Sequence, residues 1–166
     1  RSSDLALTLG VSKASAMVER WTVEHGQIDS GGSGGAVAVI DAPSGDTLKV
    51  YRDAQARLHL SIRLRDGFEK LDVTVCPTLQ IDTDQPWIHD GDKSACVTDS
   101  RGARMVLGAV ESSSLKSPLV HKLMTGTTVM FRLRLTGLGY REVLFSLRGS
   151  MQALVEVMGP GVEVTG

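Results

Sequence analysis

Cys76 and Cys96, the two cysteines of the chain, have the most easily specified chemistry. They bracket a polar segment rich in turn-forming residues, among them Pro86 and Asp90-Gly91. A disulfide between them would stabilise the fold by about 3 kcal/mol, because it restricts the unfolded chain. The alternative is two unrelated buried thiols. We favour the disulfide, which would indicate an oxidising compartment and hence a periplasmic or secreted protein.

Metal ligation is a second chemistry that this segment could offer. The two cysteines and His89 could supply three zinc ligands, but no Cys-x-x-Cys or His-x-x-x-His spacing accompanies them. Asp82 and Asp84 begin like a calcium loop, but Pro86 stands where the third ligand belongs. We therefore expect a solvated acidic loop, with no metal and no other cofactor.

A serine nucleophile is suggested by the segment Gly31–Gly35, which matches the Gly-x-Ser-x-Gly pattern around Ser33. That pattern works where a sharp turn joins a strand to a helix, so that the hydroxyl is exposed beside helix amides. Here the glycines run into a predicted strand instead. Because dense glycine is costly to order, we expect a flexible loop from Gly26 to Gly35.

Histidines are the remaining candidates for acid–base chemistry. The chain has four of them: His25, His59, His89 and His121. None has a serine, cysteine or carboxylate at a spacing that indicates a proton relay. His59 falls on the polar face of a predicted strand, where we expect a surface residue. The sequence therefore predicts a protein that is not an enzyme.

Four arginines and two residues of the inter-cysteine segment are candidates for partner binding. Arg63 and Arg65 share the polar face of one predicted strand. Arg132 and Arg134 share that of another. If the strands are neighbours, these side chains form a basic patch for a carboxylate-bearing partner or an anionic surface. A solvated sheet face, balanced by acidic residues, is the alternative that we favour.

Trp87 and His89 lie near the tip of the inter-cysteine segment. Trp87, between a proline and an isoleucine, could be an exposed anchor for a partner. It could equally form a small core for its own loop, which is the interpretation that we favour. Both residues stay, with the four arginines, among those to test for partner binding.

Composition limits the class of protein. The 166 residues suffice for one domain with a substantial core. With 18 basic and 19 acidic residues and only 4% aromatic residues, a nucleic-acid partner is not expected. No apolar run is long enough for a membrane span. Residues 5–16 faintly resemble a signal-peptide end, but Asp4 interrupts the pattern, and we expect a tail or helix over residues 1–19.

Period-two alternation predicts most of the elements. Residues 57–65 and 129–136 alternate strictly, and residues 71–76 and 141–147 are their expected hairpin partners. Weaker strand patterns cover residues 21–24, 36–40, 48–52 and 104–110. Ser117-Pro118 and Ser150 are typical starts of two short helices. We expect residues 20–166 to form a single, mainly β domain: an antiparallel β-sandwich or open barrel of about eight strands with two short helices.

The early Trp21-Thr22-Val23 segment, Cys76 with Cys96 in a β core, and the run from Phe145 to Leu154 follow one another in a recognisable order. Over roughly residues 20–158 this order resembles small periplasmic proteins of the invasion-associated locus B type. Periplasmic accessory proteins of type VI secretion are similar in the same loose sense. The resemblance implies a β fold, a periplasmic location and an envelope or secretion role, and it supplies no catalytic residue.

We therefore expect a non-enzymatic periplasmic or secreted β-sandwich that binds a protein partner or supports an envelope or secretion process. The alternative is a small-ligand or lipid-binding β-barrel, whose apolar strand faces would enclose a cavity. The identity of the partner and the oligomeric state do not follow from the residues.

Overall fold

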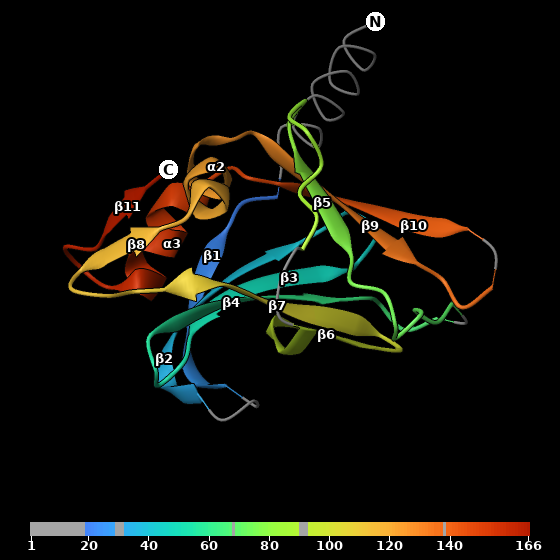
Figure 1. The fold of residues 1–166 in the computed structure, drawn as a ribbon, viewed down its shortest axis with the longest axis horizontal. Helices are drawn as coiled ribbons and strands as arrows, with labels where there is room; N and C mark the ends of the chain where they lie inside the picture. The colour runs from blue at the N-terminus through green and yellow to red at the C-terminus, as the bar shows by residue number, and fades with distance from the viewer. Residues whose placement is uncertain (1–18, 29–31, 68, 90–92, 138) are drawn as a thin grey trace, which may run out of the picture.

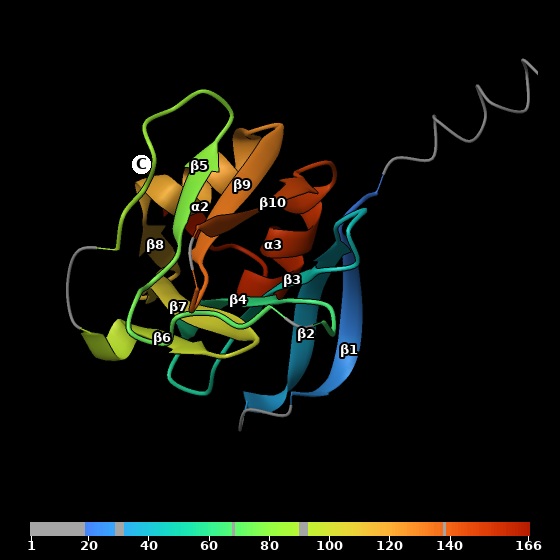
Figure 2. The same ribbon diagram turned by 90° about the vertical axis from the view of Figure 1, so that its right-hand side faces the viewer.

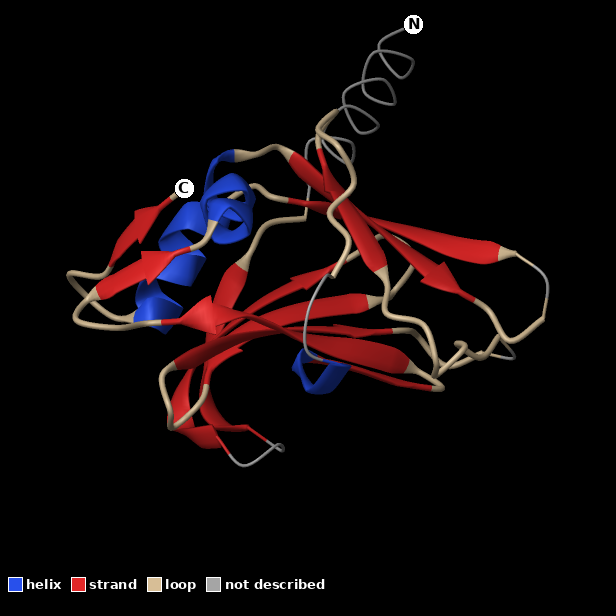
Figure 3. Cartoon of the chain, viewed as in Figure 1, coloured by secondary structure: helices blue, strands red, loops and turns tan. Residues whose placement is uncertain are grey.

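The computed structural model describes residues 19–28, 32–67, 69–89, 93–137 and 139–166. Eleven strands and two α-helices lie within these ranges (Figure 1). Strands dominate the regular structure (Figure 3), so the expectation of a mainly β chain is confirmed. The tail, helix or signal-peptide end expected over residues 1–19 falls, except for Glu19, outside the described residues.

The larger of the two main sheets has six strands, and all its neighbouring pairs are antiparallel. Its order is β1 (Thr22–Ile28), β2 (Gly32–Asp41), β3 (Thr47–Arg52), β4 (Arg57–Arg63), β7 (Gly102–Ala109) and β6 (Cys96–Asp99). The first four strands follow one another in sequence, as expected for a chain of hairpins.

The second main sheet has three antiparallel strands. Its order is β10 (Tyr140–Ser146), β9 (Thr128–Arg134) and β5 (Thr78–Ile81). The remaining elements are the parallel pair of β8 (Ser114–Lys116) and β11 (Glu163–Thr165), the helices α2 (Pro118–Thr125) and α3 (Ser150–Met158), and the 3-10 turn η1 (Lys93–Ala95). Figure 2 shows the smaller sheet and both helices on one side of the larger sheet. Both sheets are open, in agreement with a sandwich rather than a closed barrel.

The core lies between these layers and is built from alternate residues of the strands. On β4, the side chains of Leu58, Leu60 and Ile62 are completely buried. Across the core, Phe131 of β9 and Phe145 of β10 pack edge to face, with ring centroids 5.8 Å apart. The strict alternation predicted for these strands therefore reflects one face turned toward the core.

The two helices begin by different means. At α2, the Ser117 hydroxyl accepts a hydrogen bond from the Val120 amide at 3.2 Å, and Pro118 occupies the first turn, as predicted. At α3, the cap is instead Gly149, whose φ of 82° favours glycine. Ser150, expected as the cap, is the first helical residue, and its buried hydroxyl donates to the Leu123 carbonyl at 2.7 Å. This bond ties α3 to α2.

The hairpin predicted between residues 57–65 and 71–76 is wrong. The neighbours of β4 are β3 and β7, and residues 71–76 form no strand. Asp72 instead accepts hydrogen bonds from the amide and hydroxyl of Thr74, which turns the chain locally. Val73, expected to face the core, is 58% exposed. The alternation in this segment comes from a turn rather than from a sheet.

The glycine-rich segment, residues 26–35, was expected to be a flexible loop. Residues 29–31 lie outside the described residues. The expectation is wrong for residues 26–28, which end β1, and for residues 32–35. Residues 32–35 form the first part of β2 and pair with β1, in a register that sets Gly35 opposite Gly26. Backbone hydrogen bonds of the hairpin offset the entropic cost of ordering glycine. Because β2 continues as a strand from these residues, Ser33 has no turn into a helix, which a nucleophile elbow requires.

Candidate functional site

Cys76 and Cys96 form a disulfide, with an S–S distance of 2.00 Å and Cα atoms 6.2 Å apart. Cys76 lies two residues before β5, and Cys96 is the first residue of β6. Since β5 and β6 belong to different sheets, the bond links the two layers of the sandwich. It also closes the segment that carries Trp87 and His89.

The four candidate arginines do not form a common basic patch. Arg63 lies at the end of β4 in the six-stranded sheet, whereas Arg132 and Arg134 lie on β9 in the other sheet, so the strands are not neighbours. The Arg63 guanidinium pairs with Asp99 at 2.7 Å, and both groups are more than half exposed. Pairing of strands depends on the whole topology, which alternation in single segments does not reveal.

Arg132 and Arg134 share the outer face of β9 and β10 with two exposed apolar side chains, Tyr140 and Leu144. We call these four residues the β9–β10 surface. Tyr140 is 50% and Leu144 56% exposed, and Tyr140 lies opposite Arg134 in the register. The Arg132 guanidinium carbon lies 4.0 Å from the centroid of the Tyr140 ring, a cation–π contact. Glu142 lies opposite Arg132 in the register, and Arg134 Nε lies 4.0 Å from Asp72 Oδ2. The exposed face thus combines aromatic and aliphatic groups with arginines that have carboxylates beside them.

Trp87 extends the smaller sheet beyond β5. Its amide donates to the Leu79 carbonyl at 2.6 Å, and its carbonyl accepts from the Leu79 amide at 3.2 Å. The Trp87 side chain is half-buried against the main core, and the His89 ring lies edge-on to it, with centroids 5.9 Å apart. On its open side, Trp87 lines a groove of about 510 Å³ between the β5 strand and α2.

His59 was expected at the surface, and this is wrong: only 8% of the residue is exposed. Its Nε2 lies 2.7 Å from Asp53 Oδ2, and its ring stacks on Tyr51 at 5.1 Å. Burial alone would raise the pKa of Asp53, but hydrogen bonds from His59, from Arg57 and from the Gln55 amide lower this pKa to about 2. The short connection between β3 and β4 sets His59 opposite Tyr51. This short connection is the sequence signal that could have indicated the His59–Tyr51 contact.

The Asp53–His59 pair resembles half of a catalytic relay. The second ring nitrogen of His59, Nδ1, is buried and has no hydrogen-bond partner among the described residues. A relay needs a nucleophile within hydrogen-bonding distance of that nitrogen. The Asp53 carboxylate also accepts hydrogen bonds from the amide and guanidinium of Arg57, so it fixes the β3–β4 turn.

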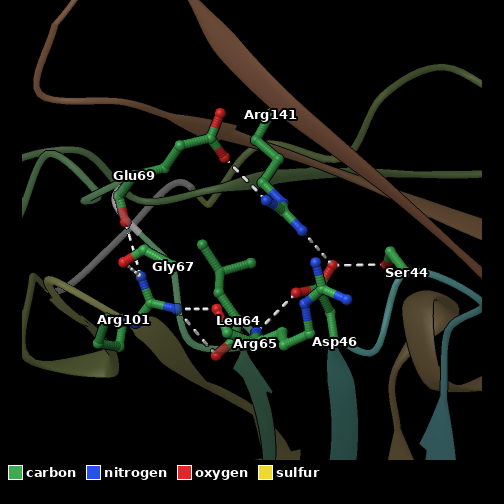
Figure 4. A network of polar contacts seen from close by, with 8 residues as sticks. All are labelled: Ser44, Asp46, Leu64, Arg65, Gly67, Glu69, Arg101 and Arg141. Carbon is green, nitrogen blue, oxygen red and sulfur yellow. Dashed lines mark hydrogen bonds and ion pairs between the residues drawn. The ribbon is translucent and has the colours of Figure 1, made fainter.

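A buried carboxylate, Asp46, joins the two sheets in a polar network (Figure 4). Asp46 is completely buried and accepts hydrogen bonds from the Ser44 hydroxyl at 2.6 Å, the Arg65 amide at 2.8 Å and the Arg141 guanidinium at 2.8 Å. Arg141, on β10, also pairs with Glu69 at 2.8 Å. Asp46 precedes β3, so the Asp46–Arg141 pair connects the two layers. The two residues are 95 positions apart, and for that reason the sequence gives no sign of the contact.

Arg101 completes the network from the turn between β6 and β7. Its guanidinium donates to four carbonyl groups of the connection that leaves β4: those of Leu64, Arg65, Gly67 and Glu69. The guanidinium groups of Arg141 and Arg101 are thus matched by carboxylates and by backbone oxygens, respectively. We interpret the cluster as a structural clamp.

Metal ligands do not gather in the part of the chain that the structure describes: no group of three His, Cys, Asp or Glu side chains is placed to hold an ion. No helix within the described ranges has the length and apolar character needed to cross a bilayer.

No protein-family model matches the chain, and no curated protein matches its sequence. Among solved structures, the crystal structure of invasion-associated protein B from Bartonella henselae is similar, with a TM-score of 0.52 and 14% sequence identity. The superposition covers 86% of this chain and 94% of the other. The chain shares the fold of invasion-associated protein B. At this identity the similarity concerns the fold alone, and at that level the resemblance inferred from the sequence is confirmed.

Two of the segments that carry the resemblance, at Trp21 and after Phe145, are in contact. Trp21 is buried, its indole Nε1 donates to the Ser146 carbonyl at 2.8 Å, and its amide donates to the Arg148 carbonyl at 3.0 Å. The early tryptophan is therefore bound to the turn that joins the late phenylalanine-containing strand to its helix. An indole N–H that is buried needs such an acceptor.

Proposed function

We propose that the protein works outside the cytoplasm as a non-catalytic β-sandwich that binds another protein through the β9–β10 surface. The observation that carries the proposal is the exposure of Tyr140 and Leu144 beside a guanidinium that is already stacked on the tyrosine ring. Tyrosine and arginine are the residue types that most often dominate binding energy at protein interfaces.

The location outside the cytoplasm is supported by the Cys76–Cys96 disulfide, because reducing compartments keep cysteines as free thiols. The shared fold with invasion-associated protein B is compatible with it. The non-catalytic role is part of the proposal and rests on the sequence, which offers no spacing typical of a proton relay.

The β9–β10 surface suits a partner because little ordering is needed on binding. Cross-strand pairing holds the backbone of Arg132, Arg134, Tyr140 and Leu144. The contact between Arg132 and Tyr140 orients both side chains in the free protein. Because these side chains are already ordered, this protein loses less conformational entropy when a partner binds, which favours affinity. Arg134 already pairs with Asp72 at 4.0 Å, so the preference for a partner with carboxylates at the interface rests on Arg132.

Site-specific photocrosslinking in the native cell envelope tests this proposal. A benzoylphenylalanine placed at Leu144 is expected to give one adduct of defined mass. The matched control is the same group at Val97, which is 50% exposed on the other sheet and is expected to give no such adduct. Adding Arg132→Glu to the Leu144 variant should abolish the adduct, since it removes the stacked cation.

The same preparation tests the compartment. Protein isolated from its own cells should take up two alkyl groups only after reduction, as measured by intact mass. Adducts of equal yield at Leu144 and Val97, or an adduct that Arg132→Glu leaves unchanged, would overturn the binding surface. Free alkylation without reductant would overturn the location.

A further inference from the structure

The groove beside Trp87 has walls of apolar character. They include Leu79 and Ile81 from β5, Leu107 from β7 and Leu119 from α2. Its volume of about 510 Å³ falls within the range of about 300–1,000 Å³ that is typical of small-molecule sites. The groove lies between the inter-cysteine segment and the start of α2.

One of the charged side chains that line the groove is a cation without an ion pair among the described residues. Lys122 pairs with Asp84 at 3.1 Å, so these two groups largely neutralise each other. Lys116, the last residue of β8, also lines the groove and has no ion pair among the described residues. The lining therefore presents an apolar surface and a single uncompensated positive charge.

Several hydrogen-bonding groups of the walls are already used within the protein. The amide and the carbonyl of Leu79 both bond to Trp87, and the other edge of β5 is paired with β9. The Ser117 hydroxyl caps α2. A peptide in extended conformation would find few partners here for its own amide and carbonyl groups, which would be costly to bury unpaired. An occupant with one polar end and an otherwise apolar body fits better.

We propose that this groove binds a single-chain fatty acid, with its carboxylate at Lys116 and its hydrocarbon chain against Trp87 and Leu119. The carboxylate supplies the one negative charge that the lining lacks. The hydrocarbon chain gains by leaving water for walls whose leucine and isoleucine side chains belong to the core. This site is separate from the β9–β10 surface, and it is independent of the protein partner proposed there. It also differs from a β-barrel cavity, because the ligand lies at the edge of the sandwich.

Fluorescence of Trp87 provides the readout, since the other tryptophan, Trp21, is buried and does not line the groove. Dodecanoate, titrated into the intact protein below its aggregation threshold, should give a saturable emission change with a stoichiometry of one. Dodecanol, with the same chain and no charge, should bind about fivefold more weakly. Octanoate should bind at least tenfold more weakly than dodecanoate, because each methylene removed from water contributes about fourfold.

Variants locate the two ends of the ligand. Lys116→Gln should weaken dodecanoate about fivefold and leave dodecanol unchanged. The matched control, Lys70→Gln, alters an exposed lysine outside the groove and should bind like the wild type. Trp87→Phe should abolish the emission change while calorimetry still detects dodecanoate.

Three results would overturn the proposal. One is the absence of saturable binding by calorimetry. Another is equal affinity for dodecanoate and dodecanol, with no effect of Lys116→Gln. The third is sedimentation of the protein with phosphatidylcholine–phosphatidylglycerol vesicles without binding of monomeric dodecanoate, which would identify a membrane as the occupant. A negative photocrosslinking result at Leu144 would leave this site unaffected.

Discussion

Replacing Arg141 with methionine should lower the free energy of unfolding by about 3 kcal/mol at neutral pH. The substitution removes two charge-assisted hydrogen bonds of 2.8 Å, one to Asp46 and one to Glu69. Asp46 would keep only its bonds from the Ser44 hydroxyl and the Arg65 amide, while its carboxylate stays completely buried. Breaking a buried pair from one side costs about 3–5 kcal/mol. We take the lower end because the Arg141 side chain is 27% exposed and water can reach its place.

The matched control is Arg63→Met, which removes another arginine–aspartate pair of similar length. Arg63 and Asp99 are 54% and 59% exposed, so this pair should contribute no more than about 1 kcal/mol. Urea unfolding, followed by circular dichroism and evaluated with a common slope, measures both variants. Equal losses of less than about 1 kcal/mol would refute the reasoning, because they would mean that burial of Asp46 does not govern the strength of the clamp.

The pH dependence provides a second check of the same reasoning. Burial acts to raise the pKa of Asp46, but hydrogen bonds from Ser44, Arg65 and Arg141 outweigh it and hold this pKa below its ordinary value of 3.8. A carboxylate with a lowered pKa stabilises the fold above the unfolded pKa, and the contribution is lost as the pH falls through the folded pKa. The difference between wild type and Arg141→Met should therefore shrink below about pH 4. A constant difference from pH 7 to pH 3 would contradict this account.

Three further predictions concern stability. Replacing Cys76 and Cys96 together by alanine should cost about 3 kcal/mol in urea unfolding, because the bond closes a loop with a sequence separation of 20 residues. Asp53, with a pKa of about 2, should add about 1–2 kcal/mol above pH 4 that disappears as the pH falls toward 2, and Asp53→Asn should flatten the stability curve over that interval. Gly102→Ala should cost about 2 kcal/mol by thermal unfolding, because its Cβ would collide with a backbone oxygen of β4, whereas Gly137→Ala, with open space around it, should cost less than about 0.5 kcal/mol.

Sequence reasoning succeeded where one long segment carries its own signal. Nine alternating residues predict β4, and the paired patterns predict the hairpin of β9 and β10. The strands that it missed, β5, β6, β8 and β11, have only three or four residues, too few for a period to emerge. These strands are held by their neighbours rather than by local preference.

The candidate site shows the same division. The only two cysteines of the chain indicate a disulfide, and Trp87 is a large aromatic residue in a polar segment. The disulfide and Trp87 could therefore be predicted as features of interest from the sequence. The groove could not, because its walls come from three parts of the chain that only the fold brings together. The four arginines failed as a patch for the converse reason: their strands have the same pattern but belong to different sheets.

The contact between Trp21 and the Ser146 carbonyl spans 125 residues of sequence. The strand β1 lies at the edge of its sheet, so it has one strand neighbour, and this long-range contact fastens its start to the opposite layer. Contacts of such separation form late, because a long loop must close before they contribute. We therefore expect the edge of the larger sheet to stay frayed during folding until β10 and α3 are in place. A fragment that ends before residue 140 would keep every strand of that sheet and still leave β1 unfastened.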